Sequence, residues 1–266
     1  MFIMISISLS LLFLVGLYLL SQQRDALYSR HYELLMGLRE LISHCREHRQ
    51  LTHYALQFDD YRPEDLALVA QQMDVTCEHL VDTAPVETRA MFRILQIKIH
   101  DITRDWSRFS LAKNQMRHGE AIRQCLFLLD DMLVTWLRKM DRDDLTYDYH
   151  RHWHVIVDSL DALTQMRIAI EDNQPQRLRE RGEVLIRRLH QLSLISKVSS
   201  RSPSSGQVIK QLEELCESTQ HLLDADARAL YQLTTALSLT IFTTYDNLVA
   251  DVISQFDSPL PTLTMI

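Results

Sequence analysis

The sequence predicts an all-α protein, with an N-terminal transmembrane helix followed by about eight antiparallel helices packed as two four-helix bundles. Three observations lead to this fold class. The 266 residues include only five glycines and six prolines, so little of the chain can form turns. Apolar residues recur at helical spacing almost throughout, while the alternation typical of strands is nearly absent. An uncharged apolar run occupies the amino terminus.

Residues 2–20, FIMISISLSLLFLVGLYLL, form a run long enough to span a bilayer as a helix. No Lys or Arg precedes the run and Tyr18-Leu19-Leu20 is a poor cleavage context, which favours an uncleaved anchor over a signal peptide. Arg24 and Arg30 follow the run, and positive residues tend to stay in the cytoplasm. We therefore expect residues 1–21 to be a single-pass anchor in the inner (cytoplasmic) membrane, with a soluble domain that is cytoplasmic rather than periplasmic.

The remaining helices are separated by prolines and polar turns. The first soluble helix, 22–58, continues out of the membrane span and ends before Asp59-Asp60-Tyr61-Arg62-Pro63, because proline cannot extend a helix. Further helices are expected at 64–83, 86–109, 113–140, 146–171, 176–197, 207–222 and 226–256. Their short connections imply antiparallel neighbours. Together they form one helical domain over 22–257.

Four local features qualify this outline. The fourth soluble helix is expected to loosen at His118-Gly119. The serine-rich stretch 199–206 is the only linker-like segment, and 258–266, with two prolines, is an irregular tail. The last helix contains the uncharged run 229–244, but Gln232 and six Ser/Thr residues make it too polar and too short to span a membrane, so a buried bundle helix is preferred.

Composition and motifs exclude several classes of function. A formal net charge of −7 argues against nucleic-acid binding. The sequence has no glycine-rich phosphate loop, dinucleotide fingerprint or Gly-x-Ser-x-Gly motif, so we expect neither an enzyme nor a cofactor. The four cysteines are widely scattered and predicted to be buried, reduced side chains. They are Cys45, Cys77, Cys125 and Cys216.

The twelve histidines raise the question of a metal site. His44 and His48 share a helix face, as do His150 and His154, and such pairs can bind zinc, copper or nickel. No Glu-x-x-His or zincin motif is present, however. We therefore predict no metal site and expect the histidines at the surface or at interfaces near turns.

Residues 41–56, LISHCREHRQLTHYAL, are similar to the first signature of the nitrate- and nitrite-sensing (NIT) domain family, which reads roughly Leu-Val-His-x-Leu-Gln-x-Glu-Arg-Gly-x-Ser-x-x-x-Leu. Positions that match or are conservative are Leu41, Ile42, Arg49, Thr52 and Leu56. Among the positions that depart from it are His48, where the family has glutamate, and Gln50, where it has glycine.

Two further segments extend the resemblance at low identity over residues 30–250. Residues 101–137 look like the middle of the family domain. The stretch LTQMRIAI, residues 163–170, aligns with the segment around the family's second arginine through Gln165 and Arg167, but lacks its glycine and glutamate. The chain thus resembles a degenerate member of the family, whose two four-helix bundles agree with the helix count.

The resemblance implies a binding site for a small planar oxyanion, nitrate or nitrite, between helices. Arg49 and Arg167 would bind the anion, with His48 and Thr52 as secondary candidates within one helical turn of Arg49. A guanidinium suits this task because its rigid fork of donors matches two oxygens and stays charged. Family members commonly carry an output module, and none is recognised here, so signalling would need an unknown partner protein.

Each arginine also has a simpler interpretation. Arg49 could pack its stem while its charged head reaches water, and Arg167 could pair with Glu171 one turn away. The expected function is thus a membrane-anchored sensory or regulatory protein that binds nitrate or nitrite. The alternative is a ligand-free helical adaptor or scaffold tethered to the membrane. The sequence leaves a homodimer open.

Overall fold

The computed structural model describes residues 2–171, 174–195, 203–218, 220 and 225–255, with the backbone alone at 2–10, 20–21, 23–28, 195 and 203–205. These residues form helices and turns and include no strand, which confirms the all-α prediction. The helices are α1 (Phe2–Phe58), α2 (Pro63–Thr83), α3 (Arg89–Asp105), the short 3₁₀ helix η1 (Trp106–Arg108), α4 (Leu111–Lys139), α5 (Asp143–Glu171), α6 (Pro175–Ile195), α7 (Pro203–Cys216) and α9 (Ala227–Ser254).

Local sequence explains where these helices begin. Pro63 occupies the first turn of α2, where a missing N–H costs nothing, and Glu64 and Asp65 favour the positive end of the helix dipole. The Ser110 Oγ caps α4 by accepting a hydrogen bond from the Lys113 N–H at 3.3 Å. The Asp226 carboxylate caps α9 in the same way.

Two expectations about helix boundaries are wrong. α7 begins at Pro203, inside the predicted linker 199–206, because a proline at the first position is compatible with a helix. α4 runs unbroken through Gly119, which lies where α4 approaches α5: a Cβ there would be 3.2 Å from Thr164 Cγ2. The glycine therefore permits close packing of two helices rather than loosening one. The predicted tail 258–266 and linker residues 199–202 lie outside the described residues.

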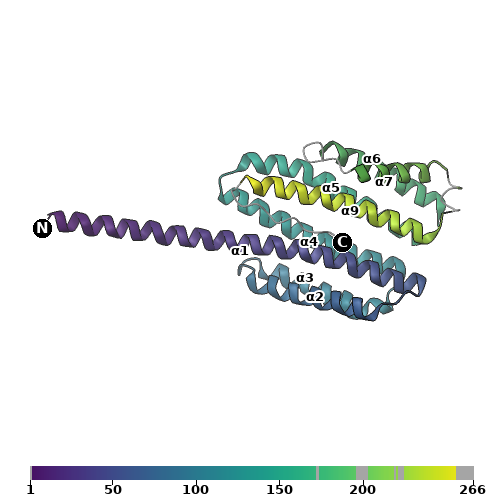
Figure 1. The fold of residues 1–266 in the computed structure, drawn as a ribbon, viewed down its shortest axis with the longest axis horizontal. Helices are drawn as coiled ribbons and strands as arrows, with labels where there is room; N and C mark the ends of the chain where they lie inside the picture. The colour runs from purple at the N-terminus through teal and green to yellow at the C-terminus, as the bar shows by residue number, and fades with distance from the viewer. Residues whose placement is uncertain (1, 172–173, 196–202, 219, 221–224, 256–266) are drawn as a thin grey trace.

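The helices pack in two rings of four (Figure 1). α1, α2, α3 and α4 contact one another in cyclic order, and so do α5, α6, α7 and α9. The rings meet where α4 lies along α5 and where α1 contacts α9 through side chains such as Arg39 and Asp246. The helices α1, α4, α5 and α9 thus form the junction between the rings.

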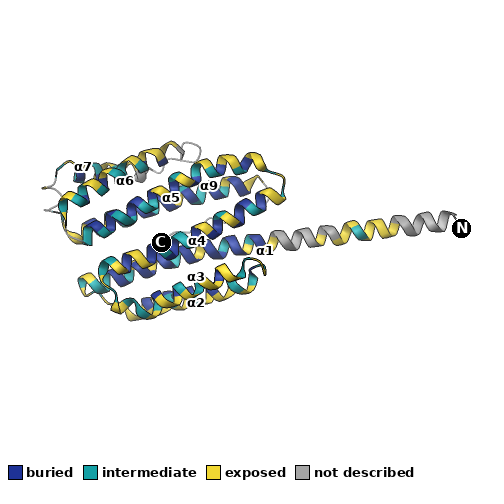
Figure 2. Ribbon diagram, turned by 180° about the vertical axis from the view of Figure 1, so that it is seen from behind, coloured by how far each residue is buried: buried dark blue, intermediate teal, exposed yellow. Residues whose placement is uncertain are grey.

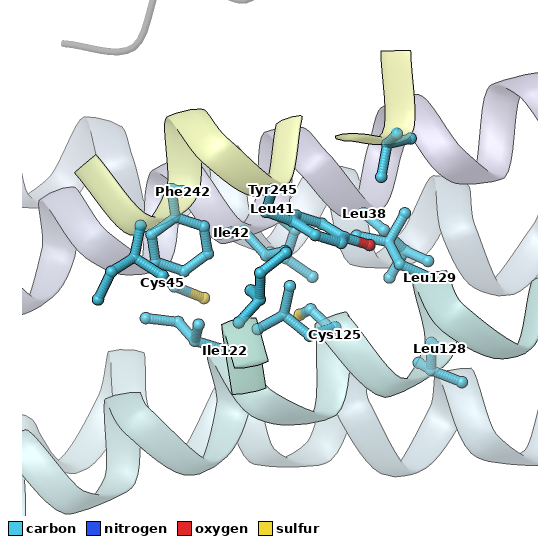
Figure 3. Packing of buried hydrophobic residues seen from close by; sticks show 14 of the residues in the cluster. Leu38, Leu41, Ile42, Cys45, Ile122, Cys125, Leu128, Leu129, Phe242 and Tyr245 are labelled. Carbon is cyan, nitrogen blue, oxygen red and sulfur yellow. The ribbon is translucent and has the colours of Figure 1, made fainter. Parts of the chain in front are cut away.

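The junction is filled by apolar side chains (Figure 3). Leu38, Leu41 and Cys45 on α1 are fully buried and face Cys125 on α4 and Phe242 on α9. Burying one such leucine contributes about 1.5–3 kcal/mol to folding. This packing fixes the helices that carry the two candidate arginines.

The first half of α1 projects away from both rings (Figures 1 and 2). Its apolar side chains at residues 11–15 and 17–19 are exposed, as at Leu12, 70% exposed, and Phe13, 67% exposed. Within the described part of the chain, no helix has a stretch that is both long and apolar enough to cross a membrane. For residues 2–10 and 20, about half of the predicted span 2–20, the structure describes the backbone alone.

A largely buried ion pair joins the two rings. The Arg39 Nε donates to Asp246 Oδ1 at 2.6 Å, and the Arg39 side chain is 3% exposed. We expect Arg39→Ala to destabilise the fold by about 3 kcal/mol, because the Asp246 carboxylate would lose its partner in a largely buried position. Urea unfolding of the full-length chain in non-ionic detergent measures this change. An unchanged midpoint would show that the pair contributes nothing.

Candidate functional site

A small cavity lies at the junction between the two rings. Its lining comes from all four junction helices: Arg49 on α1, Gly119 on α4, Arg167 on α5, and Ser238 and Phe242 on α9. The volume open to the centre of a water molecule is about 20 Å³, enough for one water-sized group.

Arg49 points into this interior rather than to solvent. The residue is 5% exposed, and its Nε is buried with no hydrogen-bond partner among the described residues. Burial lowers the pKa of Arg49, and a hydrogen bond with Tyr231 partly opposes that shift. The interpretation in which the charged head of Arg49 reaches water is therefore wrong.

Arg167 is 3% exposed and faces the same cavity from the other ring. Its Nε donates to Thr234 Oγ1 at 3.2 Å and its Nη2 donates to the Thr234 carbonyl at 2.8 Å. The structure thus brings together the two arginines that the resemblance implies, although they lie on different rings.

The electrostatics of the cavity favour an anion. The pKa of Arg167 is lowered well below its usual value, first by burial and then by the positive charges of Arg49 and Arg46, against a smaller opposing effect of Tyr231. Burial also lowers the pKa of Arg46, to about 10, and its guanidinium lies 4.8 Å from the Phe242 ring centroid. Like charges in a buried site are mutually destabilising, and a bound anion would relieve that repulsion.

His48 and Thr52 lie on α1 but do not line the cavity. Both are fully buried in a polar layer between α1 and α4. The His118 Nδ1 donates to the Asn114 carbonyl at 2.8 Å, so in the neutral ring its Nε2 accepts from His48 Nδ1 at 2.9 Å. The Thr52 hydroxyl donates to the His48 carbonyl and accepts from Asn114 Nδ2 at 3.0 Å. The two residues hold α1 against α4 next to the cavity.

A second group of polar contacts, around His53 and Tyr231, lies beside Arg49. The ring of His53 stacks on Tyr231, with centroids 3.6 Å apart and planes 6° from parallel. His53 Nδ1 also accepts from Gln115 Nε2 at 3.0 Å and lies 3.6 Å from Glu171 Oε1. The Tyr231 hydroxyl in turn donates to the Arg49 carbonyl at 3.5 Å, so residues of α1, α4, α5 and α9 meet beside the cavity.

The expectation of surface or interfacial histidines near turns is wrong for several of them. His31, His48, His53 and His118 are each 4% exposed or less. In the described part of the chain, no group of three or more His, Cys, Asp or Glu side chains could hold a metal ion. All four cysteines are free and buried, as predicted.

Sequence reasoning missed the residues that α9 places at or beside the cavity: Tyr231, Thr234, Ser238 and Phe242. All lie in the uncharged run 229–244, whose Ser and Thr content was used only to exclude a membrane span. Thr234 and Ser238 are four apart and share a helix face. That spacing on a helix expected to be buried was the signal for a polar site.

Arg123 lines the cavity on its outer side. It is partly exposed and pairs with Asp161 at 3.2 Å, so this wall faces the surface.

Comparisons of this chain with protein-family models, with curated proteins and with solved structures found no match. The resemblance to the NIT family, and the roles that it implies for Arg49, Arg167, His48 and Thr52, remain predictions.

Proposed function

We propose that this chain is a membrane-anchored sensory protein that binds a small oxyanion, nitrate or nitrite, between its two helical rings. The observation that carries the proposal is the shared cavity of Arg49 and Arg167. Two buried guanidiniums line this cavity, one from each ring, and guanidinium donors suit a small planar anion, which would offset their repulsion.

Binding would move helices because the cavity holds only one water-sized group and nitrate is larger. At least one wall must therefore shift to admit it. Arg49 belongs to the first ring and Arg167 to the second, so an anion held by both couples the positions of the rings. The anion selects the arrangement to which it binds more tightly, a population shift driven by differential affinity.

The output would pass along α1, which carries Arg49 and continues without a break to Phe2. Its projecting half exposes apolar side chains at residues 11–19, and this surface supports a single-pass membrane anchor over residues 1–21. A small rotation or piston movement of α1 is the natural signal to a partner protein. We place the bundles on the cytoplasmic side, following the arginines after the apolar run.

A thermal melt of the full-length chain in non-ionic detergent tests the anion site. Sodium nitrate or nitrite should raise the melting midpoint relative to sodium chloride at equal ionic strength, because a ligand that binds only the folded form stabilises it. At a hundredfold excess over Kd the gain is about 2.7 kcal/mol, which corresponds to roughly 5–11 °C for a chain of this size.

Two variants test whether the shift in melting midpoint depends on Arg49. Arg49→Ala should abolish the shift, whereas Arg93→Ala, at an exposed arginine on α3, should keep it. If neither anion raises the melting midpoint of the wild type, or if Arg49→Ala shows an equal shift, the anion site is refuted and the alternative function remains. In that case the chain is a ligand-free adaptor whose bundles serve protein contacts.

A further inference from the structure

The hydroxyl of Ser238 differs in its hydrogen bonding from the hydroxyls of neighbouring threonines on α9. Thr234, Thr235, Thr240 and Thr244 each donate to a backbone carbonyl three or four residues earlier, at 2.9–3.1 Å. Ser238 is 1% exposed, and its Oγ is buried with no hydrogen-bond partner among the described residues. A buried hydroxyl without a partner is costly, so this one requires an explanation.

The position of Arg167 accounts for the exception. The carbonyl four residues before Ser238 belongs to Thr234, and it already accepts a hydrogen bond from Arg167 Nη2 at 2.8 Å. A helical carbonyl has two lone pairs, one of which serves its own helix. Arg167 uses the other, so the acceptor that a serine in a helix usually takes is occupied. Ser238 lines the cavity together with Arg49 and Arg167.

We propose that Ser238 is a third hydrogen-bond donor to the anion held by Arg49 and Arg167. This inference rests on the proposed function. The two arginines supply charge and planar donor pairs, and the serine adds a neutral O–H, which can donate to an anion oxygen. The same contact gives Ser238 the partner that it lacks in the unliganded cavity.

Isothermal titration of the full-length chain in detergent with sodium nitrate and sodium nitrite tests the assignment. Ser238→Ala should weaken binding about tenfold or more, because a hydrogen bond to a charged group is lost. The unliganded variant should melt no lower than the wild type, because alanine removes a hydroxyl that has no partner. A purely structural serine would instead lower the melting midpoint and leave affinity unchanged.

Two further variants test whether the change in affinity is specific to the hydroxyl of Ser238. Thr240→Ala removes a back-bonded hydroxyl on the same helix and should leave affinity unchanged. Ser238→Cys keeps a weaker donor and should bind with intermediate affinity. If the wild type binds and Ser238→Ala binds equally well, only the role of Ser238 is refuted. If the wild type binds neither anion, both this role and the proposed function fail.

Discussion

Acidification from about pH 7.5 to about pH 5 is expected to destabilise the fold by about 4 kcal/mol through His48 and His53 alone. Burial lowers the pKa of each of these histidines to about 4. For His53, the neighbouring charges of Arg167 and Arg49 add to the shift. The pKa of His118 is also lowered well below its usual value, first by burial and then by His48.

The direction of this change in stability follows from proton binding. A histidine in the unfolded chain titrates near pH 6.5, so between about pH 6.5 and pH 4 the unfolded state binds more protons than the folded state. Stability therefore rises with pH in this window. The contribution of these neutral histidines to stability is fully present above the unfolded pKa and is lost as the pH falls toward the folded pKa of about 4.

Urea unfolding at several pH values, followed by helical circular dichroism, measures the effect. His53→Phe keeps a ring against Tyr231 but cannot take up a proton, and it should reduce the loss on acidification by about 2 kcal/mol. His100→Gln, at an exposed position on α3, is the matched control and should leave the pH profile unchanged. A wild-type profile that is flat across this range would mean that the two histidines take up protons in the folded protein as readily as in the unfolded chain.

Replacing Arg167 by methionine is expected to stabilise the unliganded protein by about 2 kcal/mol and to abolish its response to nitrate and nitrite. Arg167 is buried beside two other arginines, and its side chain bonds to Thr234 rather than to a carboxylate in the contacts described. Methionine has a similar length and no charge to desolvate. The Thr234 carbonyl keeps its place in the α9 hydrogen-bond ladder.

Arg39→Met is expected to change stability in the opposite direction. Arg39 faces Asp246, so its loss leaves a carboxylate unpaired and should lower stability. Urea unfolding of both variants without added anion, and thermal melts with nitrate, give the two comparisons. If Arg167→Met were destabilised as much as Arg39→Met, Arg167 would be a structural residue that fastens α5 to α9, and the proposal of an anion site would lose its main support.

Helix positions follow largely from local chemistry and were accessible from the sequence. Pro63 and the capping residues Ser110 and Asp226 act on residues within one turn, so their effects do not depend on the rest of the fold. Gly119 was misread because its role is set by Thr164, which lies on another helix. The start of α7 was misplaced because Ser and Pro are typical both of linkers and of the first turn of a helix.

The sequence alone determined the all-α class, the approximate helices and the choice of Arg49 and Arg167. It could not show that both arginines line one buried cavity, that His48 and Thr52 lie in an adjacent polar layer, or that Ser238 belongs beside the arginines. Helical periodicity reports which face of a helix is buried but not which helix covers it. Burial and the pairing of charges depend on contacts between distant segments, and only the packing of α1, α4, α5 and α9 decided them.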